Sequence, residues 1–235
     1  MNLWFAVQVT YAVVVFALSL YSLNHGILAV VFWWHRRRHD DVSPPTPLAR
    51  DVRVTIQLPL FNEIHVAERV IRSACAVEYP RELLEIQVLD DSTDDTLAVT
   101  ERLVAEYQAA GVPIVLLHRT DRTGYKSGAL ANALAKARGE FIAIFDADFV
   151  IPADFLTRTL PHFGDPKLGI VQTRWSYFNE TTSELTRAAS LALDGHFVVE
   201  QSARCWAGWF LNFNGTAGIL RRQAIVEAGG GRTIR

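Results

Sequence analysis

Two aspartates, Asp146 and Asp148, lie one residue apart directly after the apolar run 141–145. Such a run predicts a buried strand, and ligands bind at the carboxyl ends of strands in an open α/β sheet. Two carboxylates there suit Mg²⁺ or Mn²⁺, because these cations keep water and substrate oxygens in their coordination shell. The motif therefore indicates binding of a diphosphate through a divalent cation. Taken alone, it also fits a pair of solvated turn aspartates.

Polar side chains also follow two earlier predicted strands. The first strand is followed by Phe61, Asn62 and Glu63, a ring, an amide and a carboxylate that suit a flat nucleobase. The same residues also fit the start of a helix. After the second strand comes an acidic segment containing Asp90 and Asp91, which suits a cation or a ribose hydroxyl. Helix capping accounts for at least one of its acids.

A basic, glycine-containing loop at 119–128 follows the third predicted strand. Glycines allow the backbone to approach a phosphate closely, and Lys126 could neutralise the charge of a phosphate at the start of a helix. The loop is not a Walker loop, because the order Gly-x-x-x-x-Gly-Lys-Ser/Thr is absent. Together the clusters predict a base pocket, a ribose carboxylate, a phosphate-binding lysine and metal carboxylates at one edge of a sheet.

The elements that position these groups alternate along the chain. The periodicity predicts strands at 52–58, 86–89, 113–118, 141–145 and 168–173, and helices at 66–74, 94–111, 127–138 and 183–204. Strands separated by single helices imply a mostly parallel sheet with right-handed crossovers. The expected fold class is α/β, with a doubly wound, mostly parallel sheet.

An uncharged apolar segment precedes this domain. Residues 3–34 contain no Asp, Glu, Lys or Arg and are followed by His-Arg-Arg-Arg-His at 35–39. About 20 apolar residues cross a bilayer, so we expect one transmembrane helix within 1–39. A cleaved signal peptide fits poorly, because the run is too long and lacks a positive start. The arginines predict that a proline-containing linker, 40–51, and a domain, 52–235, lie on the cytoplasmic side.

Composition restricts the partners. The net charge is −2, so no basic surface argues for nucleic acid. The two cysteines, Cys75 and Cys205, are far apart and give neither a disulfide framework nor zinc-ligand spacing. Cys75 falls on the apolar side of a helical pattern, which predicts a buried free thiol in a reducing cytosol.

Five motifs occur in order: Pro-x-x-Asn-Glu, Leu-Asp-Asp-Ser-Thr-Asp-Asp-Thr, Tyr-Lys-Ser-Gly-Ala-Leu, Phe-Asp-Ala-Asp-Phe and Phe-Asn-Gly-Thr-Ala-Gly. This combination, over residues 53–230, resembles family 2 inverting glycosyltransferases. The resemblance is strongest to the membrane-bound cellulose synthase-like and glucomannan β-mannosyltransferase branch of polysaccharide biosynthesis. It implies a GT-A fold, a UDP- or GDP-hexose donor, Mg²⁺ or Mn²⁺, and transfer with inversion to a glycan or lipid acceptor, forming a β-glycosidic bond.

The resemblance also implies roles for individual residues on the donor side. The residues and their implied positions are Phe61 and Glu63 at the base, Asp91 at the nucleoside, Lys126 at the diphosphate, and Asp146 and Asp148 at the diphosphate and metal. On the acceptor side, Asn214, Gly215 and Thr216 match the segment that lines the acceptor sugar. Trp175, in Gln-Thr-Arg-Trp, offers a stacking face, and packing in the core or at a membrane surface is the alternative.

The chain departs from the family pattern at its end. Family members carry a Thr/Ser-Glu-Asp segment, whose Asp is the general base, and a Gln-x-x-Arg-Trp segment after Glu-Ala-Gly-Gly; neither follows 227–230 here. We therefore expect a C-terminally truncated chain with no assigned catalytic base. The alternative to an active transferase is a donor-binding remnant without efficient transfer. If the chain turns over, Asp194 and Glu200 are the first residues to test as base. A nucleotidyltransferase is a third hypothesis. The lack of a glycine-rich loop after the first strand argues against it.

Overall fold

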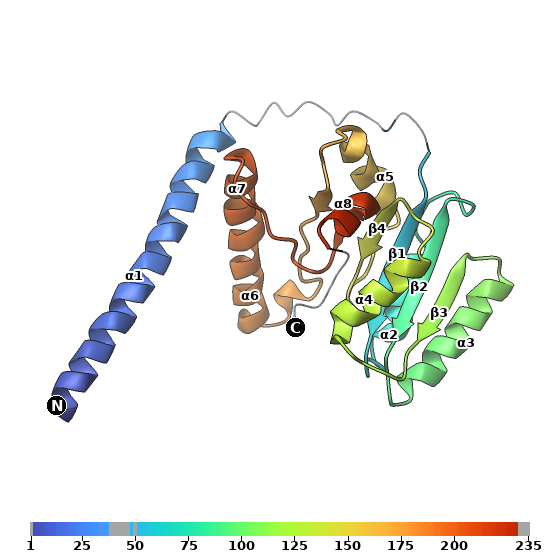
Figure 1. The fold of residues 1–235 in the computed structure, drawn as a ribbon, viewed down its shortest axis with the longest axis horizontal. Helices are drawn as coiled ribbons and strands as arrows, with labels where there is room; N and C mark the ends of the chain where they lie inside the picture. Colours follow the sequence, from blue (N-terminus) through green and yellow to red (C-terminus); the bar gives the residue numbers. More distant parts are fainter. Residues whose placement is uncertain (1, 38–47, 49–50, 230–235) are drawn as a thin grey trace. The chain divides into compact units, whose positions relative to one another are not determined.

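The computed structural model describes residues 2–37, 48 and 51–229, and Figure 1 shows their course. The predicted linker at 40–51 lies outside the described residues, apart from Leu48 and Asp51. Contacts divide the chain into two compact units. One is drawn from Met1–Ser43 and Arg174–Asn212, and the other from Pro44–Thr173 and Phe213–Arg235.

The second unit is built on a six-stranded sheet in the order β3-β2-β1-β4-β6-β5. The strands are β1 Val54–Leu60, β2 Leu84–Asp90, β3 Ile114–His118, β4 Phe141–Ile144, β5 Ile170–Gln172 and β6 Gly218–Arg221. Strands β1 to β4 are mutually parallel, whereas β6 is antiparallel to β4 and β5. The expected mostly parallel α/β sheet is confirmed, and β6 is an additional strand.

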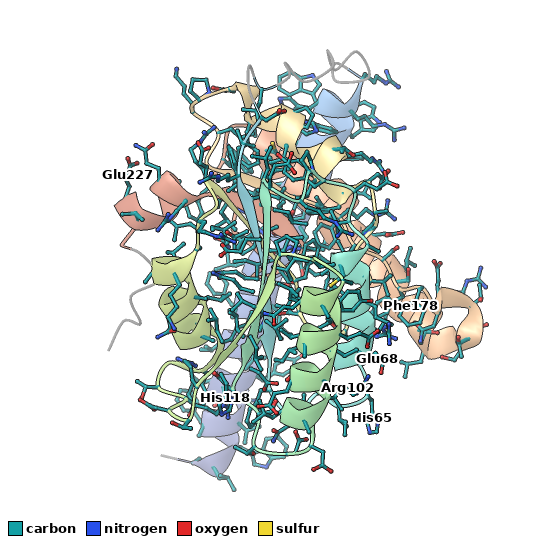
Figure 2. The ribbon with its side chains drawn as sticks, turned by 90° about the vertical axis from the view of Figure 1, so that its right-hand side faces the viewer. His65, Glu68, Arg102, His118, Phe178 and Glu227 are labelled. Atoms are coloured by element: carbon teal, nitrogen blue, oxygen red, sulfur yellow. The ribbon has the colours of Figure 1, made fainter. Side chains whose placement is uncertain are left out.

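Helices cover both faces of this sheet. They are α2 Ala67–Cys75, α3 Thr96–Ala109 and α4 Tyr125–Lys136, with the short helices α5 Phe155–Thr159, η1 Leu160–Gly164 and α8 Arg222–Glu227. Helices α2 and α3 lie on one face and α4 on the other (Figure 2). Both faces of β1 and β2 are consequently buried, which explains why these strands contain so few exposed positions.

Helix α4 approaches the sheet closely because its inward side chains are small. Ala129 and Ala133 are buried against Leu89 of β2. The sequence predicts a helix over 127–138, and the observed helix begins two residues earlier, at Tyr125. The earlier start places Lys126 in the first turn of the helix, at the same edge of the sheet as the ends of the parallel strands.

The first unit contains α1, Leu3–Arg36, which has 34 residues. Among the described residues it is the one helix long and apolar enough to cross a membrane. Its last turns pack within the unit: Leu28 is buried, and the Phe32 ring stacks on Trp206 at 5.5 Å between centroids. The preceding 25 or so residues still exceed the ~20 that a bilayer core requires.

The same unit contains one long run of consecutive helical segments. After the short turn η2 (Glu180–Thr182) come α6 Glu184–Asp194, a π-helical segment Gly195–Gln201 and α7 Ser202–Trp206. Ser183 caps α6 by accepting a hydrogen bond from the Thr186 backbone, and the Thr186 hydroxyl accepts one in return from the Ser183 backbone. The helix predicted at 183–204 is thus present, with a wider π segment in its middle.

Candidate active site

One cavity of about 360 Å³ opens at the carboxyl edge of the parallel strands. It lies entirely within the second unit. The six residues predicted for the donor side all line it: Phe61, Glu63, Asp91, Lys126, Asp146 and Asp148. They come from the segments that follow β1, β2, β3 and β4. The parallel order of these strands brings together side chains that are up to 87 positions apart in the sequence.

Three carboxylates make one side of this cavity negative. Asp146 and Asp148 follow β4, and Glu63 follows β1. Burial, followed by the like charges of Asp148 and Asp146, raises the pKa of Glu63 above its ordinary value. The three groups therefore lie within electrostatic reach of one another, and a bound cation would relieve their repulsion.

The carboxylates do not form a complete protein cage for a metal. No three His, Cys, Asp or Glu side chains lie in metal-binding geometry anywhere in the described part of the chain. Asp146 and Asp148 could supply two hard oxygen ligands and leave the other positions to water and to a ligand's phosphate oxygens. Mg²⁺ and Mn²⁺ are commonly bound in this way.

Lys126 supplies a positive charge opposite these carboxylates. Its ammonium group forms an ion pair with Asp146 and donates a hydrogen bond to the Gly215 carbonyl oxygen at 2.9 Å. The helix that carries it begins after Gly124, whose φ of +78° favours glycine. A side chain at Gly128 would bring its Cβ to 2.0 Å from the Thr123 carbonyl oxygen. Glycine at 128 therefore allows the loop to fold closely onto the first turn of α4.

Asp91 is held by a two-point contact with Arg119. The register pairs Asp90 of β2 with His118 of β3, which places the next residue of each strand side by side. The Arg119 Nε donates to Asp91 Oδ1 at 2.8 Å, and a second guanidinium nitrogen donates to Oδ2. Because Asp91 is 4% exposed and both its oxygens are engaged, its orientation at the cavity is fixed.

The amide of Asn62 has a different place from the one expected. Its sequence position suggests a residue that suits a nucleobase, but its side-chain oxygen accepts a hydrogen bond from the Thr93 backbone at 2.9 Å. Its own backbone N–H donates to the Ser92 hydroxyl, also at 2.9 Å, and its φ is +54°. Asn62 therefore ties the loop after β1 to the loop after β2, and Phe61 and Glu63 face the cavity on either side of it.

An arginine that the motifs do not single out lies on the Phe61 ring. The guanidinium carbon of Arg122 is 3.2 Å from the centroid of Phe61 and 5.3 Å from that of Tyr125. Arg122 also lines the cavity. Neither Arg119 nor Arg122 has a function predicted from the sequence. Arg119 could have been found from its position directly after β3, level with Asp91 after β2. Arg122 gives no comparable signal in the sequence, because its position depends on how the loop folds.

The predicted acceptor segment lies beside the donor residues. The Asp146 backbone N–H donates to the Thr216 hydroxyl at 2.9 Å, and Gly215 accepts from Lys126. Gln172, at the end of β5, accepts from the Asn214 backbone and donates to the Thr216 carbonyl. Asn214, Gly215 and Thr216 are thus fixed in the same unit as the cavity.

Trp175 belongs to the other unit. Its ring meets Phe197 edge-on, with 4.4 Å between centroids. The two carboxylates considered as bases are in this unit as well. Asp194 pairs with Arg174 at 2.6 Å, and Glu200 accepts from His196 and Arg204. Burial alone would raise the pKa of Glu200, but these hydrogen bonds outweigh it and lower the pKa, which makes Glu200 a weaker base.

Comparison with known proteins gives a consistent family. The model for glycosyl transferase family 2 matches residues 55–227. Glucomannan 4-beta-mannosyltransferase 9 of Arabidopsis thaliana is 44% identical over 182 residues, which are 75% of this chain and 34% of that protein. Glucomannan 4-beta-mannosyltransferase 1 of Cyamopsis tetragonoloba is 43% identical over 182 residues, which are 75% of this chain and 35% of that protein. The chain thus spans about a third of the length of these curated relatives.

A solved structure shares the fold over most of the chain. It is a mannosyltransferase from Pyrobaculum calidifontis in complex with GDP-Man and Mn²⁺, with 28% sequence identity and a TM-score of 0.70. The similarity covers 91% of this chain and 57% of that one. The expected GT-A fold is confirmed by this similarity.

Proposed function

Because the chain belongs to glycosyl transferase family 2, we propose that it acts in hexosyl transfer from a nucleotide sugar to a glycan or lipid acceptor, with inversion and formation of a β-glycosidic bond. One observation carries the proposal. A single cavity gathers an aromatic ring, a fixed carboxylate, a lysine and two strand-end aspartates from four different loops. These groups correspond in kind to the base, ribose, diphosphate and cation of a nucleotide sugar, and they follow that order along the sequence.

The donor half of the site divides into two ends in this proposal. Phe61 and Glu63 lie at the base and Asp91, oriented by Arg119, lies at the nucleoside. Lys126 and Asp146 lie at the diphosphate end. The donor is a UDP- or GDP-hexose, and the mannosyltransferase names of the relatives make GDP-mannose the first donor to test.

A divalent cation belongs to the same proposal. Asp146 and Asp148 would hold Mg²⁺ or Mn²⁺, and the cation would neutralise charge on the departing nucleoside diphosphate. The Pyrobaculum protein was solved with Mn²⁺, which supports this use of the two carboxylates. Lys126 would bind the diphosphate directly, so its ion pair with Asp146 must open when the donor enters.

The acceptor side is proposed at the segment after residue 212. Asn214, Gly215 and Thr216 would line the acceptor sugar. As a separate proposal, Trp175 of the first unit would offer a stacking face to a sugar ring. Asp194 and Glu200 are paired with cationic side chains, so neither is assigned as the base. That pairing favours a second candidate function, a domain that binds donor without transferring its sugar efficiently.

We further propose that α1 anchors the protein in a membrane. The helix is long and mostly apolar and ends in His35 and Arg36, followed by Arg37. A positive flank is typical of the cytoplasmic end of a transmembrane helix, so we propose that its C-terminal end lies at the cytoplasmic face. The proposed organisation is an anchor with its basic flank at 1–39, a linker at 40–51 and a glycosyltransferase domain at 52–235. Donor and acceptor would then meet at the cytoplasmic surface of the membrane.

The test uses the full chain in lipid nanodiscs with Mn²⁺. Radiolabelled GDP-mannose or UDP-glucose is supplied with manno- or gluco-oligosaccharides, and both released nucleotide and labelled glycan are measured. Incorporation of sugar in a β linkage supports the transferase. Donor binding without incorporation supports the donor-binding alternative, and no binding of either donor refutes both. Asp148→Asn serves as the site-specific control.

A further inference from the structure

Arg122 covers one face of the Phe61 ring. Its guanidinium carbon is 3.2 Å from the ring centroid, which is the separation of two stacked planar groups. Phe61 is also the ring proposed to stack on the nucleobase, and both residues line the cavity. A planar guanidinium therefore lies where a planar base would lie.

Arg122 differs from the neighbouring cations of its loop because no described residue is its anionic partner. Arg119 is paired with Asp91, and Lys126 is paired with Asp146. The structure shows no salt bridge from Arg122 to any described residue, and its buried Nε lacks a hydrogen-bond partner among them. A buried donor on a charged group is costly when unpaired, so the side chain is suited to a ligand that supplies acceptor oxygens.

We propose that Arg122 couples recognition of the base to recognition of the diphosphate. In the nucleotide-free protein its guanidinium occupies the face of Phe61. When a nucleoside diphosphate binds, the base takes that face and the guanidinium turns to the diphosphate beside Lys126. This inference rests on the proposed function, since it requires the cavity to be a nucleotide site.

The exchange requires only side-chain motion. Arg122 is two residues before Gly124 and one helical turn before Lys126, so a long side chain can address either end of the cavity. Its backbone is held in a turn, because the Tyr125 N–H donates to the Arg122 carbonyl oxygen at 2.7 Å. The side chain therefore moves from a fixed point.

Energetics make the two recognition events depend on each other. Stacking of a base on an aromatic ring and stacking of a cation on that ring are of similar strength. A base that merely displaces Arg122 from the ring consequently gains little binding free energy. The displaced guanidinium gains strongly only if phosphate oxygens are present, because Arg binds phosphate through two parallel hydrogen bonds. A ligand that carries both parts is selected over either part alone.

The experiment compares a nucleoside with its diphosphate. Affinities of guanosine, GDP, uridine and UDP are measured with Mn²⁺ by competition against a fluorescent nucleotide, for the wild-type chain, Arg122→Ala and Arg122→Lys. In Arg122→Ala we expect affinity for the tighter diphosphate to fall by about tenfold or more, and affinity for its nucleoside to stay the same or rise several-fold. Arg122→Lys retains the charge but not the planar stack, so nucleoside affinity should match Arg122→Ala and diphosphate affinity should lie between the other two.

Two controls and a stability measurement separate the outcomes. Lys126→Ala should weaken binding of the diphosphate and leave binding of the nucleoside unchanged. Arg102→Ala, on an exposed part of α3, should change neither affinity. Thermal unfolding of each variant reports whether it folds. A loss of nucleoside and diphosphate affinity by the same factor in both Arg122 variants, or unchanged diphosphate affinity, overturns the coupling. A wild-type chain that binds no nucleotide refutes the proposed function instead.

Discussion

The Lys126 ammonium group is bonded to the carboxylate of Asp146 across the carboxyl edge of the sheet. The same nitrogen donates to the Gly215 carbonyl oxygen, so one side chain joins the loop after β3, the end of β4 and the proposed acceptor segment. Both charged side chains are more than a third exposed, and an ion pair of this kind contributes at most about 1 kcal/mol to folding. We infer that the pair serves ligand binding more than stability.

Replacing Lys126→Met should therefore separate function from stability. The change retains the aliphatic length and removes the charge that we assign to the diphosphate. We expect affinity for GDP or UDP to fall by at least about tenfold while the free energy of unfolding changes by less than about 1 kcal/mol. Calorimetric titration and thermal unfolding measure the two quantities. Unchanged nucleotide affinity would show that Lys126 does not contact the diphosphate.

Gly128→Ala tests the close packing of the loop on α4. The added Cβ would lie 2.0 Å from the Thr123 carbonyl oxygen, so the loop that carries Arg122 must shift. We expect a destabilisation of about 1–3 kcal/mol, together with weaker nucleotide binding. Gly195→Ala is the matched control, because a Cβ there has no atom within 4 Å. A Gly128→Ala variant as stable as the control would contradict the described loop geometry.

Glu63→Gln should make the nucleotide-free protein slightly more stable at neutral pH. Burial, Asp148 and Asp146 raise the pKa of Glu63, so the folded state disfavours its charged form. Any stability linked to its protonation is present at low pH and is lost as the pH rises through the folded-state pKa. The unfolding temperature of the Gln variant should exceed that of the wild type by about one or two degrees at pH 7.5, because a partly exposed group changes the free energy of unfolding only slightly. The two temperatures should converge near pH 4, and a difference that does not depend on pH would rule out this electrostatic cause.

The two cysteines should react with alkylating reagents at very different rates. Cys75 is half-buried, less than the fully buried thiol that the sequence predicts, whereas the Cys205 side chain is exposed. Burial raises the pKa of Cys75 to about 12. Only the thiolate reacts, so at pH 8 we expect Cys75 to be labelled at least about 100-fold more slowly than Cys205 under native conditions. Peptide mapping after a timed iodoacetamide pulse gives both rates, and unfolding in urea should equalise them. Equal rates in the native protein would contradict the partial burial of Cys75.

The sequence predicts the sheet and the donor-side cluster because both follow from local patterns. Alternating or continuous apolar runs define β1 to β4, and each run is followed by a polar residue such as Asp91 or Asp146. Parallel pairing then requires those residues to share one edge. Four separate local signals thus predict one common cavity.

The features that the sequence does not predict depend on contacts between distant segments. Strand β6 has four residues and is recognisable only because Ile219 pairs with Ala143 on one side and Val171 on the other. The stack of Arg122 on Phe61 requires the loop after β3 to fold over the end of β1. The engagement of Asn62 with Thr93 likewise depends on two loops that meet only in the folded sheet. No periodicity within a single segment records such contacts.

Above all, we propose that this cavity binds a nucleoside diphosphate through a divalent cation held by Asp146 and Asp148. The most direct test is calorimetric titration of the full chain with GDP and with UDP, in Mn²⁺ and in EDTA, for the wild type, Asp148→Asn and the exposed control Asp154→Asn. We expect Mn²⁺ to strengthen nucleotide binding by the wild type and by Asp154→Asn. We expect Asp148→Asn to lower the affinity in Mn²⁺ by more than about tenfold, or about 1.4 kcal/mol. Equal affinity for all three proteins, with and without Mn²⁺, would contradict it.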